Sequence, residues 1–413
     1  MTFAMEGAGV GRLKQFFFDD IGKHLRRPEQ RASFATYAYG LLTDGERKSV
    51  EPIASRATGE ERECQRMHDR LLHFVGDSPW SDRAVRREAA AYVTSVLGAR
   101  EPVTTWIIDD TGFPKQGTHS VGVQRQYTGT LGKIGNCQIG VSLVVSTRTE
   151  HVPIDFALYL PRTWTDDPAR RSEARLPEDV VFKTKPELAR DLIERAVEDK
   201  VPGEIVLADA AYGESFHLRE RVRELGLDYA VAIRSTTKAW LLDAASRRRF
   251  EPLSVGEIAA CLDRSHFRRY TWREGSREGR TRGKLASRFW FRRVKVAHDD
   301  GTAVAQREPL WLALEWPEGE PKPTKYFLTT LPRRMSKKNI IRTIKERWRT
   351  ERAYEEMKGE LGLDHFEGRS FRGWHHHVSV VLCCYAFVVA ERVRHFSPSA
   401  GRSRRDRALP RAA

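Results

Sequence analysis

The chain has 413 residues, with 71 Lys and Arg against 56 Asp and Glu, which gives a formal net charge of +15. A chain of this length can bury a large core without disulfides or metals, and its positive charge favours a polyanionic partner such as nucleic acid. The five cysteines form neither a CxxC pair nor a zinc spacing, which argues against a disulfide scaffold or zinc finger and indicates a reducing, cytoplasmic setting.

No membrane association is expected. The first 17 residues lack the apolar core of a signal peptide. The longest apolar stretch, Val378 to Ala390, is shorter than the roughly 20 residues that a membrane-spanning helix needs. This stretch therefore predicts a core helix of a soluble protein.

Helical periodicity without strand alternation dominates residues 1–98. The last helical segment has Ser81 as a candidate cap and Gly98 as a candidate end. Several basic residues lie among these helices. The pattern predicts an α-helical N-terminal DNA-binding domain over residues 1–98.

From residue 99 the pattern changes to strands. Three runs rich in Val, Ile and aromatic residues predict an antiparallel meander: VTTWIID, CQIGVSLVVST and VPIDFALYL. A helix from about Lys185 to Lys200 follows, then the strand EIVLADAAYG, another helix and the strand DYAVAIR. This order is that of an RNase H-like α/β core with a mixed sheet, whose first part we place at residues 99–234.

A basic, β-rich insertion interrupts this core at residues 235–322. Its residues 264–295 contain 12 Lys or Arg and 2 Glu, a net charge of 12 − 2 = +10. Trp272 and Trp290 lie among these bases, as in surfaces that follow a DNA backbone and stack an unpaired base. The same alternation is also typical of a half-exposed strand.

The second part of the core spans residues 323–396. It contains the strand KYFLTTLP and a long helix from Ser336 to about Leu361, which Gly362 ends. The remaining residues, 397–413, are basic and poor in apolar side chains, which predicts a disordered tail.

Carboxylates follow two strands that should be neighbours. Asp109 and Asp110 end the first core strand, and Asp209 ends the fourth. On the long helix, the spacing places Glu351 on one face with Arg347, Lys358 and Tyr354, while Glu356 points elsewhere. Converging carboxylates repel one another unless cations neutralise them, and two Mg²⁺ ions shared with a phosphate would do so.

Such a site would cut or join phosphodiester bonds. Each acid also has a purely structural explanation. An Asp at a strand end is often a turn former or a helix cap. Glu351 can form a surface ion pair with Arg347 at i, i+4.

Together these motifs resemble the DDE transposases of bacterial insertion sequences, in the branch whose RNase H-like core carries a β-rich insertion before the catalytic Glu. Arg347, Glu351 and Lys358 match that branch's signature of Arg, three residues, Glu, six residues, Lys. Ile344 stands where a Tyr is expected. IDDTG matches the first-Asp motif, and LADAAYG matches the second.

The resemblance implies Asp110, Asp209 and Glu351 as the catalytic residues and as ligands of two Mg²⁺, for which Mn²⁺ would substitute. The family's catalytic acid directly precedes Thr, which selects Asp110 over Asp109. Because strand side chains alternate between faces, Asp109 is expected to point away from the site. The candidate DNA contacts are Arg347, Lys358, Lys115, Tyr212, Trp272 and Trp290.

The implied activity is that of an insertion-sequence transposase acting on DNA in the bacterial cytoplasm. It would bind inverted-repeat ends of double-stranded DNA as a homodimer, hydrolyse the DNA there and join the 3′-hydroxyls to target DNA. Two alternatives stay open: an RNase H-like endonuclease without strand transfer, and a catalytically silent DNA-binding derivative. A glycosidase with paired carboxylates is disfavoured, since carbohydrate binding does not require so basic a segment.

Overall fold

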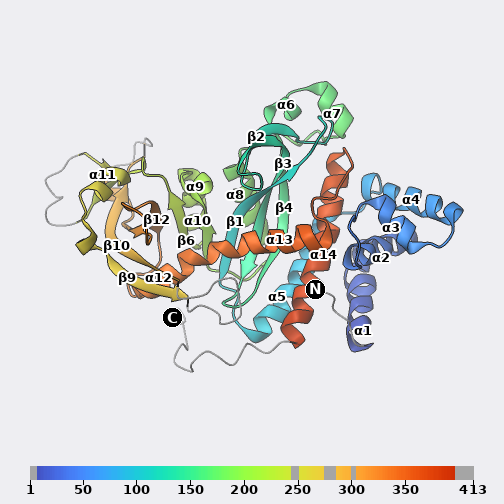
Figure 1. Ribbon diagram of the computed structural model, residues 1–413, viewed down its shortest axis with the longest axis horizontal. Coiled ribbons are helices and arrows are strands. Elements are labelled where there is room, and N and C mark those ends of the chain that lie inside the picture. The colour runs from blue at the N-terminus through green and yellow to red at the C-terminus, as the bar shows by residue number, and fades with distance from the viewer. Residues whose placement is uncertain (1–6, 243–250, 274–284, 299–303, 396–413) are drawn as a thin grey trace.

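The computed structural model describes residues 7–242, 251–273, 285–298 and 304–395. A large mixed sheet runs through the molecule, the N-terminal helices gather beyond one end of it, and the strands of the predicted insertion lie at the other (Figure 1). Predictions for the tail and for residues 274–284 fall outside the described residues.

The strands are, in chain order, β1 (Thr105–Pro114), β2 (Gln124–Thr128), β3 (Lys133–Ser146), β4 (His151–Tyr159), β5 (Ile205–Ala208), β6 (Asp228–Ile233), β7 (Lys238–Leu241), β8 (Leu253–Ser254), β9 (Arg268–Arg273), β10 (Leu285–Val296), β11 (Leu310–Trp316) and β12 (Lys325–Thr329). The α-helices are α1 (Gly7–Gln15), α2 (Pro28–Leu42), α3 (Val50–Ala57), α4 (Glu61–Gly76), α5 (Asp82–Arg100), α6 (Arg162–Thr165), α7 (Pro168–Ala174), α8 (Lys185–Glu198), α9 (Ala210–Gly213), α10 (Phe216–Glu224), α11 (Val255–Ala260), α12 (Lys337–Ile344), α13 (Arg349–Leu361) and α14 (Phe371–His395). Shorter helical turns are η1 (Phe16–Asp20), η2 (Gly22–His24), η4 (Arg264–His266), η5 (Val304–Gln306) and η6 (Lys345–Trp348).

The described strands form one sheet in the order β2-β3-β1-β5-β6-β12-β11-β10-β7-β8, with β4 also on β3 and β9 also on β10. Strands β1, β3 and β4 form the predicted antiparallel meander, and β1, β5 and β6 run parallel. The prediction of a mixed α/β fold with N-terminal helices is therefore confirmed. Strand β2 was not predicted.

The insertion continues the core sheet. Strand β12 pairs with β6 on one side and with β11 on the other, and β11 pairs with β10. The strands of the predicted β-rich insertion therefore share one hydrogen-bonded sheet with the core.

Both faces of β1 are buried, and its neighbouring residues enter different cores. Ile108 belongs to the larger core, which also contains side chains from α5 and α14. Ile107 packs in a second core with Ile340 and Ile344 of α12. Since side chains alternate along a strand, residues after Ile108 continue to alternate between these two faces.

The predicted long helix is divided into three pieces. Ser336 caps α12 by accepting a hydrogen bond from the backbone N–H of Asn339, and Gly362 ends α13 in the left-handed region with φ 64°. Both ends agree with the sequence, but the four residues of η6 form a tighter 3-10 turn between α12 and α13. Helix α13 then crosses the sheet beside β1 (Figure 1).

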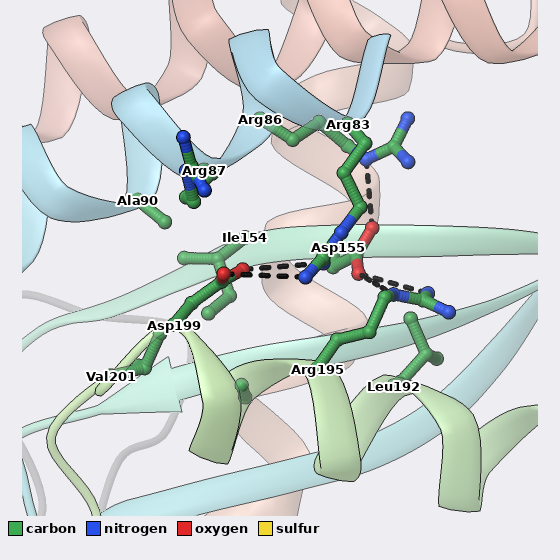
Figure 2. A pocket seen from close by; sticks show the side chains of 11 residues that line it. Arg83, Arg86, Arg87, Ala90, Ile154, Asp155, Leu192, Arg195, Asp199 and Val201 are labelled. Atoms are coloured by element: carbon green, nitrogen blue, oxygen red, sulfur yellow. Dashed lines mark hydrogen bonds and ion pairs between the residues drawn. The ribbon is translucent and has the colours of Figure 1, made fainter. Parts of the chain in front are cut away.

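Helices α5 and α8 are fixed to β4 through one buried acid. Asp155 on β4 pairs with Arg86 of α5 at 2.7 Å and with Arg195 of α8 at 2.9 Å (Figure 2). Burial opposes ionisation of Asp155, but the two guanidinium groups outweigh it and lower the pKa of this carboxyl. These ion pairs connect the N-terminal helices to the sheet.

Helix α14 is a core helix, as the sequence predicts. It is long and apolar enough to cross a membrane, but 89% of its most apolar window is buried inside the protein. His377 on this helix is fully buried, accepts a hydrogen bond from the Tyr37 hydroxyl at 2.8 Å and lies 3.1 Å from the Gly362 carbonyl. It thereby links α2 and α14 to the end of α13.

His377 should make the fold sensitive to acid. Burial lowers its pKa to about 4, so unfolding takes up a proton at any pH between about 4 and the ordinary value near 6.5. Stability should fall as the pH falls through this window, by about 1.4 kcal/mol per pH unit. Urea unfolding at pH 7 and pH 5 measures the loss. His377→Gln should reduce the slope by this contribution and leave that of other buried histidines such as His376, whereas the exposed His217→Gln should leave the slope unchanged.

Candidate active site

Helix α13 lies on the face of β1 that carries Asp109. The Arg347 guanidinium donates to Asp109 Oδ2 at 2.6 Å, and the Lys358 ammonium donates to Thr111 Oγ1 at 2.8 Å. Ser142, the register partner of Asp109 on β3, meets the Tyr354 hydroxyl at 2.6 Å. The sequence correctly predicts that Asp109 and Asp110 face opposite ways, but the expectation that Asp109 points away from Arg347 and Glu351 is wrong.

Asp110 points to the other face of β1. Its Oδ2 accepts one hydrogen bond from the Tyr212 hydroxyl at 2.8 Å and one from the Lys185 ammonium at 3.1 Å. Tyr212 is fully buried in α9, and Lys185 is the first residue of α8. Asp110 is therefore engaged by two protein donors on the side of the sheet away from α13.

Asp209 lies beside Asp109. The parallel register between β1 and β5 ends with Ile108 opposite Ala208, so these two acids are the next residues on neighbouring strands. The predicted approach of the acids on these two strands is confirmed, but β1 continues to Pro114, so Asp109 and Asp110 lie within the strand and do not end it. Asp209 also caps α9, because its Oδ1 accepts a hydrogen bond from the Ala211 N–H at 2.8 Å.

Asp109, Asp209, Glu351 and Arg347 form one electrostatic group. Burial raises the pKa of Asp109 to about 7; the Arg347 charge opposes this rise, and the Asp209 charge adds to it. Burial also works against the charge on Arg347, but Asp109, Asp209 and Glu351 together raise the pKa of its guanidinium. Because burial disfavours the ionised form of Asp109, a nearby cation would stabilise the carboxylate.

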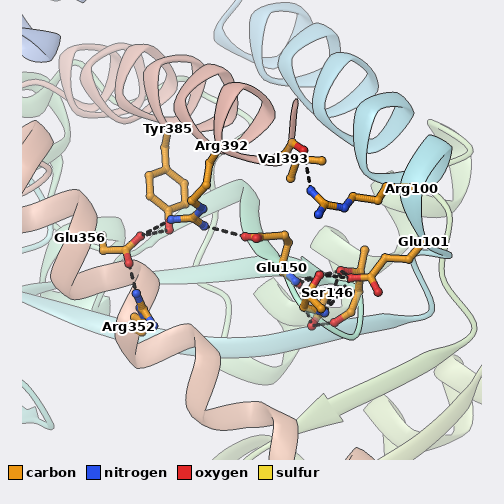
Figure 3. Close-up of polar contacts among 11 residues, drawn as sticks. Arg100, Glu101, Ser146, Glu150, Arg352, Glu356, Tyr385, Arg392 and Val393 are labelled. Atoms are coloured by element: carbon orange, nitrogen blue, oxygen red, sulfur yellow. Dashed lines mark hydrogen bonds and ion pairs between the residues drawn. The ribbon is translucent and has the colours of Figure 1, made fainter. Parts of the chain in front are cut away.

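Glu351 is exposed and, within the described part of the chain, makes no hydrogen bond or ion pair. The ion pair with Arg347 that helical spacing allows is not formed, because Arg347 pairs with Asp109. Glu356 points away from the site, as predicted, and is held by Arg352, Tyr385 and Arg392 (Figure 3).

The donor chemistry of this group fits a divalent metal. Carboxylate oxygens are the hard ligands that Mg²⁺ prefers. Asp109 and Asp209 are adjacent, and Glu351 lies on the helix that crosses them. Among the described residues, no three His, Cys, Asp or Glu side chains are close enough together to hold an ion as they stand. In this arrangement Arg347 supplies the positive charge that Asp109 requires.

Two predicted phosphate contacts are instead occupied within the protein. The Lys358 ammonium also donates to the Gly112 carbonyl at 2.8 Å, and burial lowers its pKa. The Lys115 ammonium donates to the Phe366 carbonyl at 2.5 Å, so it is directed to the loop after α13 and not to the carboxylates. Both lysines connect the end of β1 to other elements.

The two tryptophans predicted to contact DNA lie in the sheet of the insertion. Trp290 is buried, with 7% of its surface exposed, so its ring has no free face for a nucleobase. Trp272 is half-buried and packs edge-on against Phe289, with the Lys345 ammonium 4.8 Å from its ring centre. Their side chains serve the packing of this part of the sheet.

Sequence reasoning missed two residues near the site. Lys185 follows the Thr184 cap of α8, a position that gives no hint of a contact with Asp110. Trp348 follows Arg347 directly, is 38% exposed and has the Arg273 guanidinium 4.6 Å from its ring centre. An apolar ring within the charged run KERWRTER was the available signal.

Neighbouring acids where two parallel strands stop pairing, with Glu351 and Arg347 across from them, are the elements of a metal-dependent phosphoryl-transfer site. The chain belongs to the DDE superfamily endonucleases, whose family model matches residues 20–279. The resemblance drawn from the motifs is thereby confirmed, and membership implies use of a divalent metal. The matched region contains Asp109, Asp110 and Asp209 and ends before Glu351.

The chain is also similar to a probable transposase for the insertion sequence element IS701 of Microchaete diplosiphon. The two are 33% identical over 207 residues, which cover 49% of this chain and 50% of that protein. The chain thus matches about half the length of this curated relative. Among solved structures, a piggyBac transposase in a synaptic complex with hairpin DNA matches with a TM-score of 0.45 and 13% identity, covering 93% of this chain and 75% of that one.

Proposed function

We propose that the protein is an insertion-sequence DNA transposase. It binds the terminal inverted repeats of double-stranded DNA as a homodimer, cleaves the DNA at these ends and joins the 3′-hydroxyls to target DNA. Family membership and the similarity to an insertion-sequence transposase support this proposal. The basic residues 264–295 and the net charge of the chain suit a DNA substrate.

The observation that carries the proposal is the position of Asp109 and Asp209 under α13. Strands β4-β3-β1-β5-β6 have the order and directions that we propose for an RNase H-like core, with β1 and β5 parallel and adjacent. Ligands in such sheets bind at the carboxyl ends of the parallel strands; Asp209 directly follows β5, and Asp109 lies in β1 just past its pairing with β5. Helix α13 carries Glu351 over the same edge, and the preceding turn η6 carries Arg347.

Asp109, Asp209 and Glu351 would hold two Mg²⁺ ions, with Mn²⁺ as a substitute. When bound, such ions activate a water or a 3′-hydroxyl and stabilise the leaving oxygen. Arg347 has a second role: once Asp109 is neutralised by other cations, its planar fork is free to bind a DNA phosphate. Asp110 is not part of this ligand set, because its carboxylate faces Tyr212 and Lys185.

Incubation with Mg²⁺ and DNA carrying the repeats that flank its gene tests the proposal. Supercoiled target plasmid and pre-cleaved ends are added in a second reaction. Joined products support transposition, whereas nicking alone would indicate an endonuclease without strand transfer. Binding without any cleavage would indicate a silent DNA-binding derivative. Asp209→Asn should remove both reactions and retain DNA binding.

A further inference from the structure

The short helix α9 holds Asp209 in place over the edge of the sheet. Asp209 caps its first turn, and the helix has only four residues, Ala210 to Gly213. A single helical turn has little stability of its own, because the conformational entropy lost in forming the first turn exceeds the stabilisation from its hydrogen bond. Strand β5 fixes the backbone that leads into Asp209, and the direction of the Asp209 side chain then depends on the contacts that α9 makes with other elements.

One such contact is with β6. A Cβ atom built on Gly213 would lie 1.9 Å from the carbonyl oxygen of Ala232, so no side chain fits between α9 and β6. The close approach presses the end of α9 onto the sheet. It fixes the height of the helix above β6 but does not connect it to β1, the strand that carries Asp109.

The contact with β1 is made by Tyr212. Its hydroxyl, three residues after Asp209, donates to Asp110 Oδ2 at 2.8 Å. Burial, followed by the charge of Asp110, raises the pKa of Tyr212 well above its ordinary value, so the hydroxyl keeps the proton that it donates. The Lys185 ammonium, 3.1 Å from the same oxygen, compensates the carboxylate charge and adds α8 to the contact.

We infer that Asp110, Tyr212 and Lys185 form an anchor that positions Asp209 beside Asp109 for metal binding. These three residues are positioning residues, and none of them touches the metal or the DNA. The inference rests on the proposed function in so far as Asp209 is a ligand there. Residues that orient metal ligands from behind typically account for about tenfold or more of the metal affinity.

Tyr212→Phe tests the anchor, because it removes the hydroxyl and keeps the buried ring. Tyr385→Phe is the matched control: Tyr385 is equally buried, and its hydroxyl donates to a carboxylate oxygen of Glu356 at 2.7 Å, away from the site (Figure 3). Mn²⁺ binding to the full chain is measured by titration with electron paramagnetic resonance detection. Thermal unfolding is measured on the same samples without metal.

Tyr212→Phe should weaken Mn²⁺ binding about tenfold, while Tyr385→Phe leaves it unchanged. The two variants should lose similar thermal stability, since each loses one buried hydrogen bond. Equal Mn²⁺ affinity of Tyr212→Phe and wild type would overturn the anchor. Tight Mn²⁺ binding by a wild-type protein that cleaves no DNA would overturn the proposed function and leave the anchor standing.

Discussion

Asp109→Asn should reduce metal-dependent DNA cleavage by at least about a thousandfold, because a carboxylate that holds a catalytic metal contributes several kcal/mol to the stability of the transition state. Asn keeps the size of the side chain and one oxygen, but loses the charge that Arg347 and a divalent cation require. Since burial already raises the pKa of Asp109 to about 7, the site does not depend on this charge for folding. The variant should fold.

Asp110→Asn is the paired variant. The amide oxygen of Asn can still accept the hydrogen bond from the Tyr212 hydroxyl, and only the negative charge beside Lys185 is lost. We expect cleavage to fall at low Mg²⁺ and to recover most of its rate at saturating Mg²⁺. Single-turnover cleavage against Mg²⁺ concentration measures both variants. If Asp110→Asn lost all cleavage and Asp109→Asn retained it, Asp110 and not Asp109 would be the metal ligand.

The order of the elements could be predicted because each carries its own local signal. Strand β1 opens with an apolar run and β5 is one, and the carboxylates directly follow these runs in the sequence. Parallel neighbours end at one edge of a sheet, so the approach of Asp109 to Asp209 follows from topology. The helix boundaries at Ser336 and Gly362 follow from capping chemistry.

The face of the sheet that each acid occupies could not be predicted. Alternation along a strand shows only that neighbouring residues point to opposite faces, and not which face each one takes. Which of Asp109 and Asp110 faces α13 depends on the side of the sheet where that helix packs. The evidence for that side is spread over long-range contacts, such as Ile107 with Ile340 and Lys358 with Thr111. The family motif, in which the catalytic acid directly precedes Thr, selects Asp110, whereas the structure places Asp109 beside Arg347.

Pairing between strands that are far apart in the sequence explains the other differences between the predicted and the observed fold. Strand β2, with the sequence QRQYT, has few apolar residues and owes its pairing to β3. The insertion was expected to form a subdomain because its sequence differs from the core. Its strands join the core sheet because β12 pairs with both β6 and β11, and no local sequence pattern indicates this pairing.

Arg347→Ala should slow cleavage by about a hundredfold and move its pH optimum upward. Arg347 opposes the rise of the Asp109 pKa, so its removal leaves a buried carboxylate with Asp209 nearby and no guanidinium. The pKa of Asp109 should then rise further above 7. Because the ionised form binds the metal, the active fraction falls at neutral pH and returns as the pH increases.

Cleavage rates between pH 6.5 and 9 measure this effect in wild type, Arg347→Ala and Arg347→Lys. Lys keeps the charge without the bidentate fork, so it should restore the pH profile more fully than the rate. Arg352→Ala is the control and should behave as wild type, because Arg352 lies on α13 and pairs with Glu356. A uniform loss in Arg347→Ala with an unchanged pH profile would mean that Arg347 acts on DNA alone and does not set the charge of Asp109.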